Sequence, residues 1–362
     1  MRQVNKADKL LRRAEGLRNS ARYSDALLLF KKAMEAYKRN DDRESTLHCL
    51  MSIGDTCRMI GKFKLAAENY CKAIELGREI KDSMTMTDAT VGIGLSMRAL
   101  GRWKEALNLF SIAKRFYNVK KDKDGMAFVL WAEGGAFRIK GDILNAIKSF
   151  KKSHELFKAM KYRPGTGYSL CGLGGACRIA GLFNESLKYY TAANKMFSEL
   201  RDTFGIAYSH CGIGNALRMK DDYADAQAHF KKATALYRKI GDIVSYSYTL
   251  WSLGKTYTML GRLDRAKDCF KHSHELFRKT RDPRGIIYCK LGNGEVEFLK
   301  GNFSSARRDF KSALRDSLSN KFSVEGCHAQ TLLSFMGGKI DNRCYNRLGL
   351  RLRFRSIPFN IP

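Results

Sequence analysis

A forty-residue repeat runs through most of this chain and restricts what the chain can fold into. In each of eight repeats a small residue stands at one place, and an aromatic residue follows at another. The small residues are Ala14, Gly54, Gly94, Gly134, Gly174, Gly214, Gly254 and Gly294, and the aromatic residues are Phe30, Tyr70, Phe110, Phe150, Tyr190, Phe230, Phe270 and Phe310. Such a period is typical of a solenoid, in which each unit buries a face against the next.

Each repeat carries the pattern of two helices. Numbered so that the small residue is position 8, the units span 7–46, 47–86, 87–126, 127–166, 167–206, 207–246, 247–286 and 287–326. Positions 1–14 have apolar residues at helical spacing and end near a turn glycine, and positions 17 to about 34 carry a second apolar stripe. The remaining half-unit predicts a capping helix at 327–338, and the basic segment 339–362 leaves the pattern.

These units resemble the tetratricopeptide repeat. That family has small residues at positions 8, 20 and 27 and aromatic residues near 17 and 24, and this chain has Ala or Ser at positions 20 and 27 throughout. The resemblance covers residues 7–337 and implies an all-α fold, a right-handed α-solenoid of eight helix-turn-helix units with a C-terminal capping helix. The period is forty rather than 34, and the family's proline at position 32 is absent. Longer helices are therefore expected, as in the subclass of spindle-orientation adaptors, kinesin light chains and bacterial response-regulator phosphatases.

Arginine occupies position 12 in six consecutive units, at Arg18, Arg58, Arg98, Arg138, Arg178 and Arg218. At 3.6 residues per turn, positions 2, 5, 9 and 12 share one face of the first helix. In tetratricopeptide proteins this face commonly lines a concave groove that holds an extended ligand, so the resemblance implies that the arginines line a groove. Guanidinium groups suit bidentate recognition of carboxylates or phosphates. Alternatively, the arginines stabilise helix C-termini, or duplication copied an ancestral arginine.

The same helix face supplies the other candidate contacts. Aromatic residues stand at position 2 in the last five units, and tryptophan stands at position 5 in two of them. Aromatic residues at helical spacing also serve packing, so both roles stay open for them. The predicted partner-binding residues are Arg58, Arg98, Arg138, Arg178, Arg218, Trp131, Tyr168, Tyr208, Asn215, Tyr248 and Trp251.

The composition narrows the class of protein. A formal charge of +30 favours acidic partners. The chain has neither an apolar stretch of membrane-spanning length nor a signal-peptide pattern, and its ten cysteines form no C-x-x-C pair. We therefore expect a cytoplasmic protein whose cysteines are reduced packing residues. No nucleotide-binding, metalloprotease or hydrolase motif occurs, so we expect no enzyme activity, cofactor or metal site.

The sequence leaves three functions open. The leading hypothesis is an adaptor whose groove holds an acidic segment of a partner protein. The second is binding of single-stranded nucleic acid, with phosphates on the arginines and bases stacked on the aromatic rings. A small anionic ligand is a weaker third. The tail, with alternating charged and apolar residues from Arg347 to Arg355, predicts a strand, a segment docked in the end of the groove, a contact with an anionic surface, or disorder.

Overall fold

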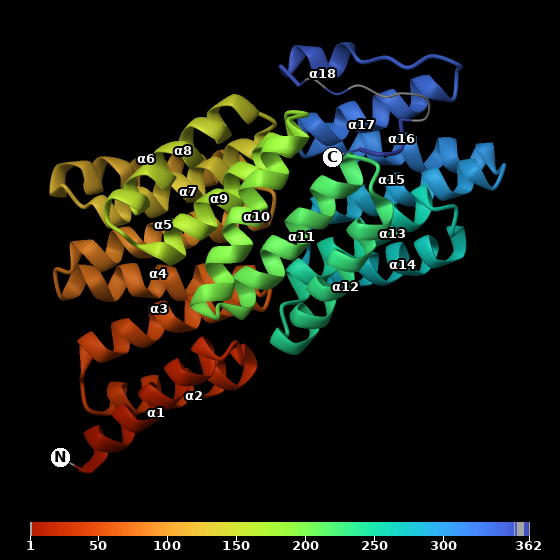
Figure 1. The fold of residues 1–362 in the computed structure, drawn as a ribbon. Coiled ribbons are helices and arrows are strands. Elements are labelled where there is room, and N and C mark those ends of the chain that lie inside the picture. Colours follow the sequence, from red (N-terminus) through yellow and green to blue (C-terminus); the bar gives the residue numbers. More distant parts are fainter. Residues whose placement is uncertain (1, 351, 353–357, 362) are drawn as a thin grey trace.

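The chain folds into a single row of paired antiparallel helices that coils on itself (Figure 1). The computed structural model describes residues 2–350, 352 and 358–361, with side chains from residue 6 onward. The helices of these described residues are α1 (Arg2–Asn19), α2 (Tyr23–Arg39), α3 (Arg43–Met59), α4 (Phe63–Glu79), α5 (Ser83–Ala99), α6 (Trp103–Lys120), α7 (Lys123–Lys140), α8 (Ile143–Ala159), α9 (Arg163–Ile179), α10 (Phe183–Leu200), α11 (Thr203–Met219), α12 (Tyr223–Ile240), α13 (Ile243–Met259), α14 (Leu263–Thr280), α15 (Pro283–Leu299), α16 (Phe303–Ser319), α17 (Ser323–Phe335) and α18 (Arg343–Arg347).

Every connection between successive helices from α1 to α17 contains one residue in the left-handed region. At position 15 this is mostly glycine, whereas at position 35 it is mostly a lysine or arginine, with φ from 51° at Asp41 to 88° at Gly141. A single left-handed residue ends a helix and reverses the chain at small cost when no β-branched side chain is present. Six of the first helices then begin at an aspartate whose carboxylate accepts a backbone N–H of the first turn: Asp42, Asp82, Asp122, Asp202, Asp242 and Asp282.

The aromatic residue at position 24 packs directly on glycine. Each of the eight rings is at most 5% exposed. The Tyr190 ring lies between Gly174 of its own unit and Gly212 of the next, where an added methyl carbon would stand 2.7 and 2.1 Å from ring atoms. Tyr70, Phe150 and Phe270 are held between glycine pairs in the same way. The ring therefore sets both the spacing within a pair and the spacing between pairs.

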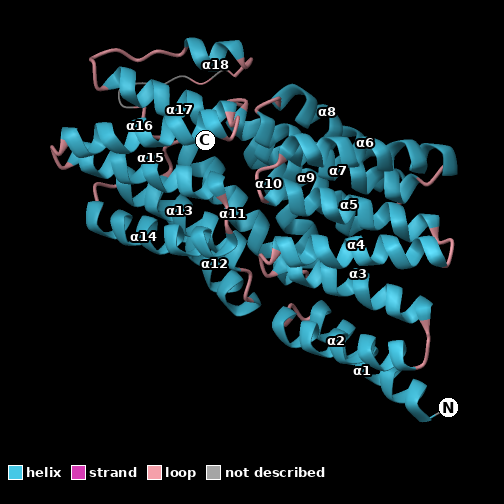
Figure 2. Cartoon of the chain, turned by 180° about the vertical axis from the view of Figure 1, so that it is seen from behind, coloured by secondary structure: helices cyan, strands magenta, loops and turns pink. Residues whose placement is uncertain are grey.

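The coil closes because distant units touch. The turn glycine Gly61 lies against Val244 and Thr280, and a methyl carbon added at Gly101 would lie 2.7 Å from Phe322 Cζ. Gly141 lies similarly against Ser323 and Val324. Both views show the first and second halves of the chain side by side (Figure 2). First helices therefore enclose an interior instead of lining an open trough.

The all-α solenoid with a capping helix is confirmed, and its helices differ from expectation at their starts. First helices begin about four residues earlier than the predicted units, as in α3 at Arg43, so both helices of a pair have 17 or 18 residues. The first helices therefore contain most of the residues by which the forty-residue repeat exceeds the 34-residue repeat. The capping helix α17 likewise begins at Ser323 instead of 327. No helix of the described residues is long and apolar enough to cross a membrane.

The expectation that all cysteines are unpaired was wrong for one pair. Cys327 and Cys344 form a disulfide with a Cα–Cα distance of 5.4 Å, whereas the other eight cysteines are free. The sequence pattern missed this pair because Cys344 lies outside the repeat. The chain reverses direction after α17, so that α18 packs against α17. This packing brings the two sulfur atoms together.

Gly212→Ala should lower the free energy of unfolding by about 1–3 kcal/mol, because the new methyl group overpacks the Tyr190 ring. A methyl carbon added at the exposed helical Gly16 would have no atom within 4 Å, so Gly16→Ala is the matched control and should keep or slightly raise stability. Chemical denaturation measures both. Equal effects in the two variants would contradict the role given to the ring.

A histidine pair should make stability depend on pH. His210 and His229 approach to 3.0 Å between their Nδ1 atoms, and burial, His229 and Lys232 lower the pKa of His210 to about 4. The unfolded chain takes up this proton near pH 6.5, so stability is lost as the pH falls from about 6.5 to 4. His210→Gln should flatten that part of a stability–pH curve, whereas the exposed control His272→Gln should leave the slope in place.

Candidate functional site

The first helices enclose a cavity of about 280 Å³ in the centre of the coil. Three of its four arginines come from consecutive first helices, since Arg98 lies on α5, Arg138 on α7 and Arg178 on α9. The facing wall belongs to α11, α13 and α15. From the predicted site residues this wall contributes Tyr208, Asn215, Tyr248 and Trp251. The cavity thus brings together residues that are far apart in the sequence.

The arginines lie in a stacked row and repel one another. Burial lowers the pKa of Arg98 to about 9, with further lowering by Arg138 and Arg58. Burial also lowers the pKa of Arg178, and Arg138 contributes to that shift. Among the described residues, neither Arg138 nor Arg178 forms an ion pair, and their buried Nε–H groups have no acceptor. Arg58 and Arg218 have unpaired Nε–H groups as well.

The guanidiniums of Arg98 and Arg138 reach forward to the next unit instead of capping their own helices. Arg98 donates to the carbonyl oxygen of Ala132 at 3.2 Å and stacks over the Trp131 ring at 5.3 Å. The Nη1 atoms of Arg98 and Arg138 fill space beside Gly135 and Gly175, at position 9 of the following unit. The row therefore has a packing role between units, and it still leaves donors unpaired beside the cavity.

The predicted aromatic contacts divide into two groups. Tyr168 and Tyr248 donate their hydroxyls to Asp202 and Asp282, the aspartates that begin the next first helices, at 2.8 and 2.7 Å. The indole N–H groups of Trp131 and Trp251 donate to backbone carbonyls of the following unit. These four side chains fix the register between units. Tyr208 lines the cavity. Burial raises the pKa of its hydroxyl, and the positive charges of Arg138 and Arg98 partly oppose this shift.

Four predicted arginine-row or aromatic residues do not line the cavity: Arg58, Trp131, Tyr168, and Arg218, which is described below. Arg58 approaches Asp55 at 3.8 Å, and Trp131 and Tyr168 pack between helices. Conversely, the repeat pattern does not mark Arg284, which lines the cavity and donates to Glu325 Oε1 at 2.5 Å and to the Tyr288 hydroxyl at 2.8 Å. Arg284 sits at the start of α15, outside the four positions that line the groove in the family.

The C-terminal end of the interior is already filled. Arg218 is fully buried and donates from Nη1 to Asn360 Oδ1 at 2.6 Å and from Nη2 to the Ile361 carbonyl at 3.0 Å. Nearby, the fully buried Lys255 and Glu295 form an ion pair. Burial lowers the pKa of Arg218 to about 9 and that of Lys255 to about 8, and raises the pKa of Glu295. The tail residues that reach this place are therefore docked in the groove end, whereas 351 and 353–357 lie outside the described residues.

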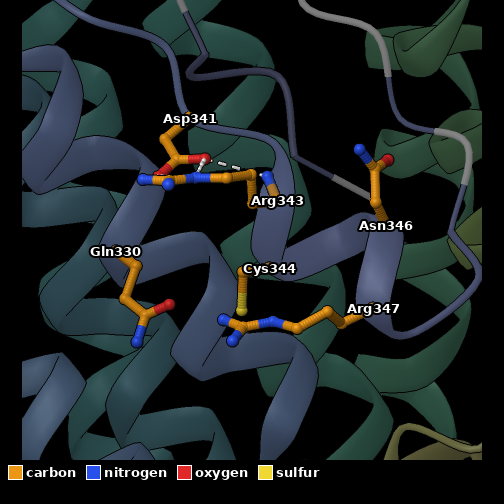
Figure 3. A pocket seen from close by; sticks show the side chains of 6 residues that line it. All are labelled: Gln330, Asp341, Arg343, Cys344, Asn346 and Arg347. Carbon is orange, nitrogen blue, oxygen red and sulfur yellow. Dashed lines mark hydrogen bonds and ion pairs between the residues drawn. The ribbon is translucent and has the colours of Figure 1, made fainter.

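A second hollow lies at the surface between α17 and α18 (Figure 3). Asp341 and Arg343 form an ion pair at its edge, and Arg347 extends across Cys344. Gln330, Arg343, Asn346 and Arg347 are exposed. Exposed ion pairs contribute little energy and select ligands weakly, so the central cavity is the stronger candidate site.

The buried ion pair generates a prediction. Glu295→Gln removes the carboxylate and leaves the Lys255 ammonium buried without its counter-charge, which should lower the free energy of unfolding by about 3 kcal/mol. The exposed pair of Lys300 and Asp264 provides the control, and Asp264→Asn should change stability by less than about 1 kcal/mol. Urea denaturation at pH 7 compares the two. A cost for Glu295→Gln as small as the control would mean that Lys255 and Glu295 are not paired in the interior.

Comparisons with known proteins agree with the repeat pattern. The tetratricopeptide repeat family model matches residues 6–79 and 165–239. No curated protein matches the chain. Among solved structures, the chain is similar to a Rap protein complexed with competence and sporulation factor, with 13% identity, a TM-score of 0.60, and coverage of 93% of this chain and 99% of that one.

A second structure, the Rap conjugation gene regulator of plasmid pLS20 in complex with the Phr* peptide, gives 14% identity, a TM-score of 0.64, and coverage of 88% of this chain and 95% of that one. At such identity the likeness concerns the fold. The finer resemblance to spindle-orientation adaptors and kinesin light chains stays a prediction. The family match over residues 6–79 and 165–239, the eight in-register helix pairs and their small and aromatic positions together support the tetratricopeptide repeat superfamily for this chain.

Proposed function

We propose that this chain is a non-enzymatic interaction scaffold whose central cavity binds an extended, acidic segment of a partner protein. The observation that carries the proposal is the stacked row of Arg98, Arg138 and Arg178 at the cavity wall. Two of these guanidiniums have a buried N–H without an acceptor. A buried donor without a partner costs about 1–3 kcal/mol, and more when it is charged. Carboxylates of a ligand would supply acceptors and counter-charge at once.

The rest of the cavity fits a peptide. Its facing wall carries Asn215 and Tyr208 beside the buried Trp251 surface, which offers hydrogen-bonding groups next to apolar area. Pockets with that mixture recognise ligands through a few placed polar groups. The similar Rap conjugation regulator was solved with the Phr* peptide, so a solenoid of this fold can accommodate a peptide ligand.

Single-stranded nucleic acid is the alternative ligand that the positive net charge of the chain favours. Bases would need free aromatic faces, and Tyr168, Tyr248, Trp131 and Trp251 are engaged in contacts between units. A small anionic ligand is the weaker alternative, although a cavity of about 280 Å³ fits a small ligand better than a whole peptide, only part of which could enter it. The eight free cysteines support the expected cytoplasmic location, whereas the Cys327–Cys344 disulfide does not.

The test measures binding of a dye-labelled deca-glutamate peptide by fluorescence anisotropy at low salt. Arg138→Gln combined with Arg178→Gln should weaken binding by about 100- to 10,000-fold, because each of the two charge-assisted hydrogen bonds contributes about 1.5–3 kcal/mol. Arg307→Gln with Arg308→Gln, two exposed residues of α16, removes the same charge from the outer surface and should have little effect.

Two results would overturn this function. Equal losses in the interior and exterior double variants would show that the peptide responds only to net charge. Displacement of the peptide by a poly-thymidine oligonucleotide that binds more tightly, with the same dependence on Arg138 and Arg178, would favour the nucleic-acid alternative. A deca-glutamine peptide serves as the uncharged control for both.

A further inference from the structure

The segment Pro358–Ile361 lies inside the solenoid, although α18 just before it lies at the outer edge. Both views place the C-terminal end of the chain beside α11 and α15 (Figures 1 and 2). Phe359 and Ile361 are each 1% exposed, and Pro358 is buried as well. The segment is thus an internal occupant of the groove end, next to the cavity that Arg178 lines.

The contacts to this segment are those that hold a peptide ligand. Asn360 makes reciprocal hydrogen bonds with Arg218, accepting from Nη1 at 2.6 Å and donating from Nδ2 to the Arg218 carbonyl at 2.7 Å. Two backbone carbonyls of the segment are also bound, since Ile361 accepts from Arg218 Nη2 and Phe359 accepts from Lys255 Nζ. Asn215 and Glu295 in turn hold Arg218 and Lys255 in position. Backbone recognition of this kind does not depend on the ligand's side chains.

Apolar contacts on both sides of Asn360 add selectivity. The Phe359 ring packs against Phe298 and Phe335 at centroid distances of 5.5 and 5.9 Å. Phe298 stands at position 12, the place that arginine occupies in six earlier units. Thr258 occupies this position in the unit between Arg218 and Phe298, so the inner surface changes from cationic to apolar over units six to eight.

We propose that Asn215, Arg218, Lys255 and Glu295 form a peptide-binding site that selects an apolar–asparagine–apolar segment. The 358–361 segment occupies this site as a tethered ligand. A partner segment with the same pattern competes with it for the same contacts. Tethering gives such an internal ligand an effective concentration of about 1 mM, so a free peptide that binds the vacant site with a Kd of about 10 µM would appear about 100-fold weaker in the intact chain.

The test uses the full chain and a dye-labelled, acetylated and amidated peptide of sequence Ser-Ile-Pro-Phe-Asn-Ile-Pro. Phe359→Asp places a charge in the aromatic pocket and should release the segment, so this variant should bind the peptide about 100-fold more tightly than the unsubstituted chain. Adding Arg218→Ala should abolish that binding. A peptide with alanine in place of asparagine should bind weakly to both the unsubstituted chain and the Phe359→Asp chain. Fluorescence anisotropy and melting temperature are measured together.

Equal peptide binding by the unsubstituted and Phe359→Asp chains would overturn the proposal, as would no binding to a folded Phe359→Asp chain. If Phe359→Asp melts below the assay temperature, Asn360→Ala replaces it, because it removes the reciprocal bonds and keeps the ring in place. The same two outcomes then decide. The probe carries no acidic residue, so its binding is independent of the acidic-peptide function proposed above, and either can fail alone.

Discussion

The contact between an aromatic ring and two glycines determines most of this structure. A ring such as Tyr190 touches Gly174 on its own unit and Gly212 on the next, so a single side chain sets two helix-to-helix distances. Glycine is needed because any larger residue would enter the ring volume. Repeating this contact with a constant spacing places equivalent positions of all first helices on one inner surface. The arginine row stacks for that reason, and its mutual repulsion follows from the packing.

The sequence was sufficient to predict the fold class, the helix pairs and the inner position of several candidate residues. Periodic small and aromatic residues directly encode nearest-neighbour contacts, and a period is visible without coordinates. The cavity accordingly contains Arg98, Arg138, Arg178, Tyr208 and Asn215. Whether those residues bind a partner stays a prediction, because packing between units and ligand binding use the same arginines.

Other features depend on contacts that a repeat cannot reveal. Tyr168 pairs with Asp202 and Trp131 with the backbone of Tyr168, and each partner lies in another helix of the stack. Arg284 reaches the cavity only because the coil turns back on itself. The Cys327–Cys344 bond and the docked 358–361 segment arise from residues after the last repeat, for which no equivalent positions exist to compare.

The closure of the coil has a consequence for how the molecule unfolds. In an open array each unit contacts only its neighbours, so the ends can fray and stability adds up unit by unit. Here the turn at Gly101 rests on Phe322, and the turn at Gly61 rests on Val244. These packing contacts between early and late units couple the stability of the two ends of the array. Loss of one terminal pair therefore removes support from a unit near the middle, and the array should melt in a single cooperative transition.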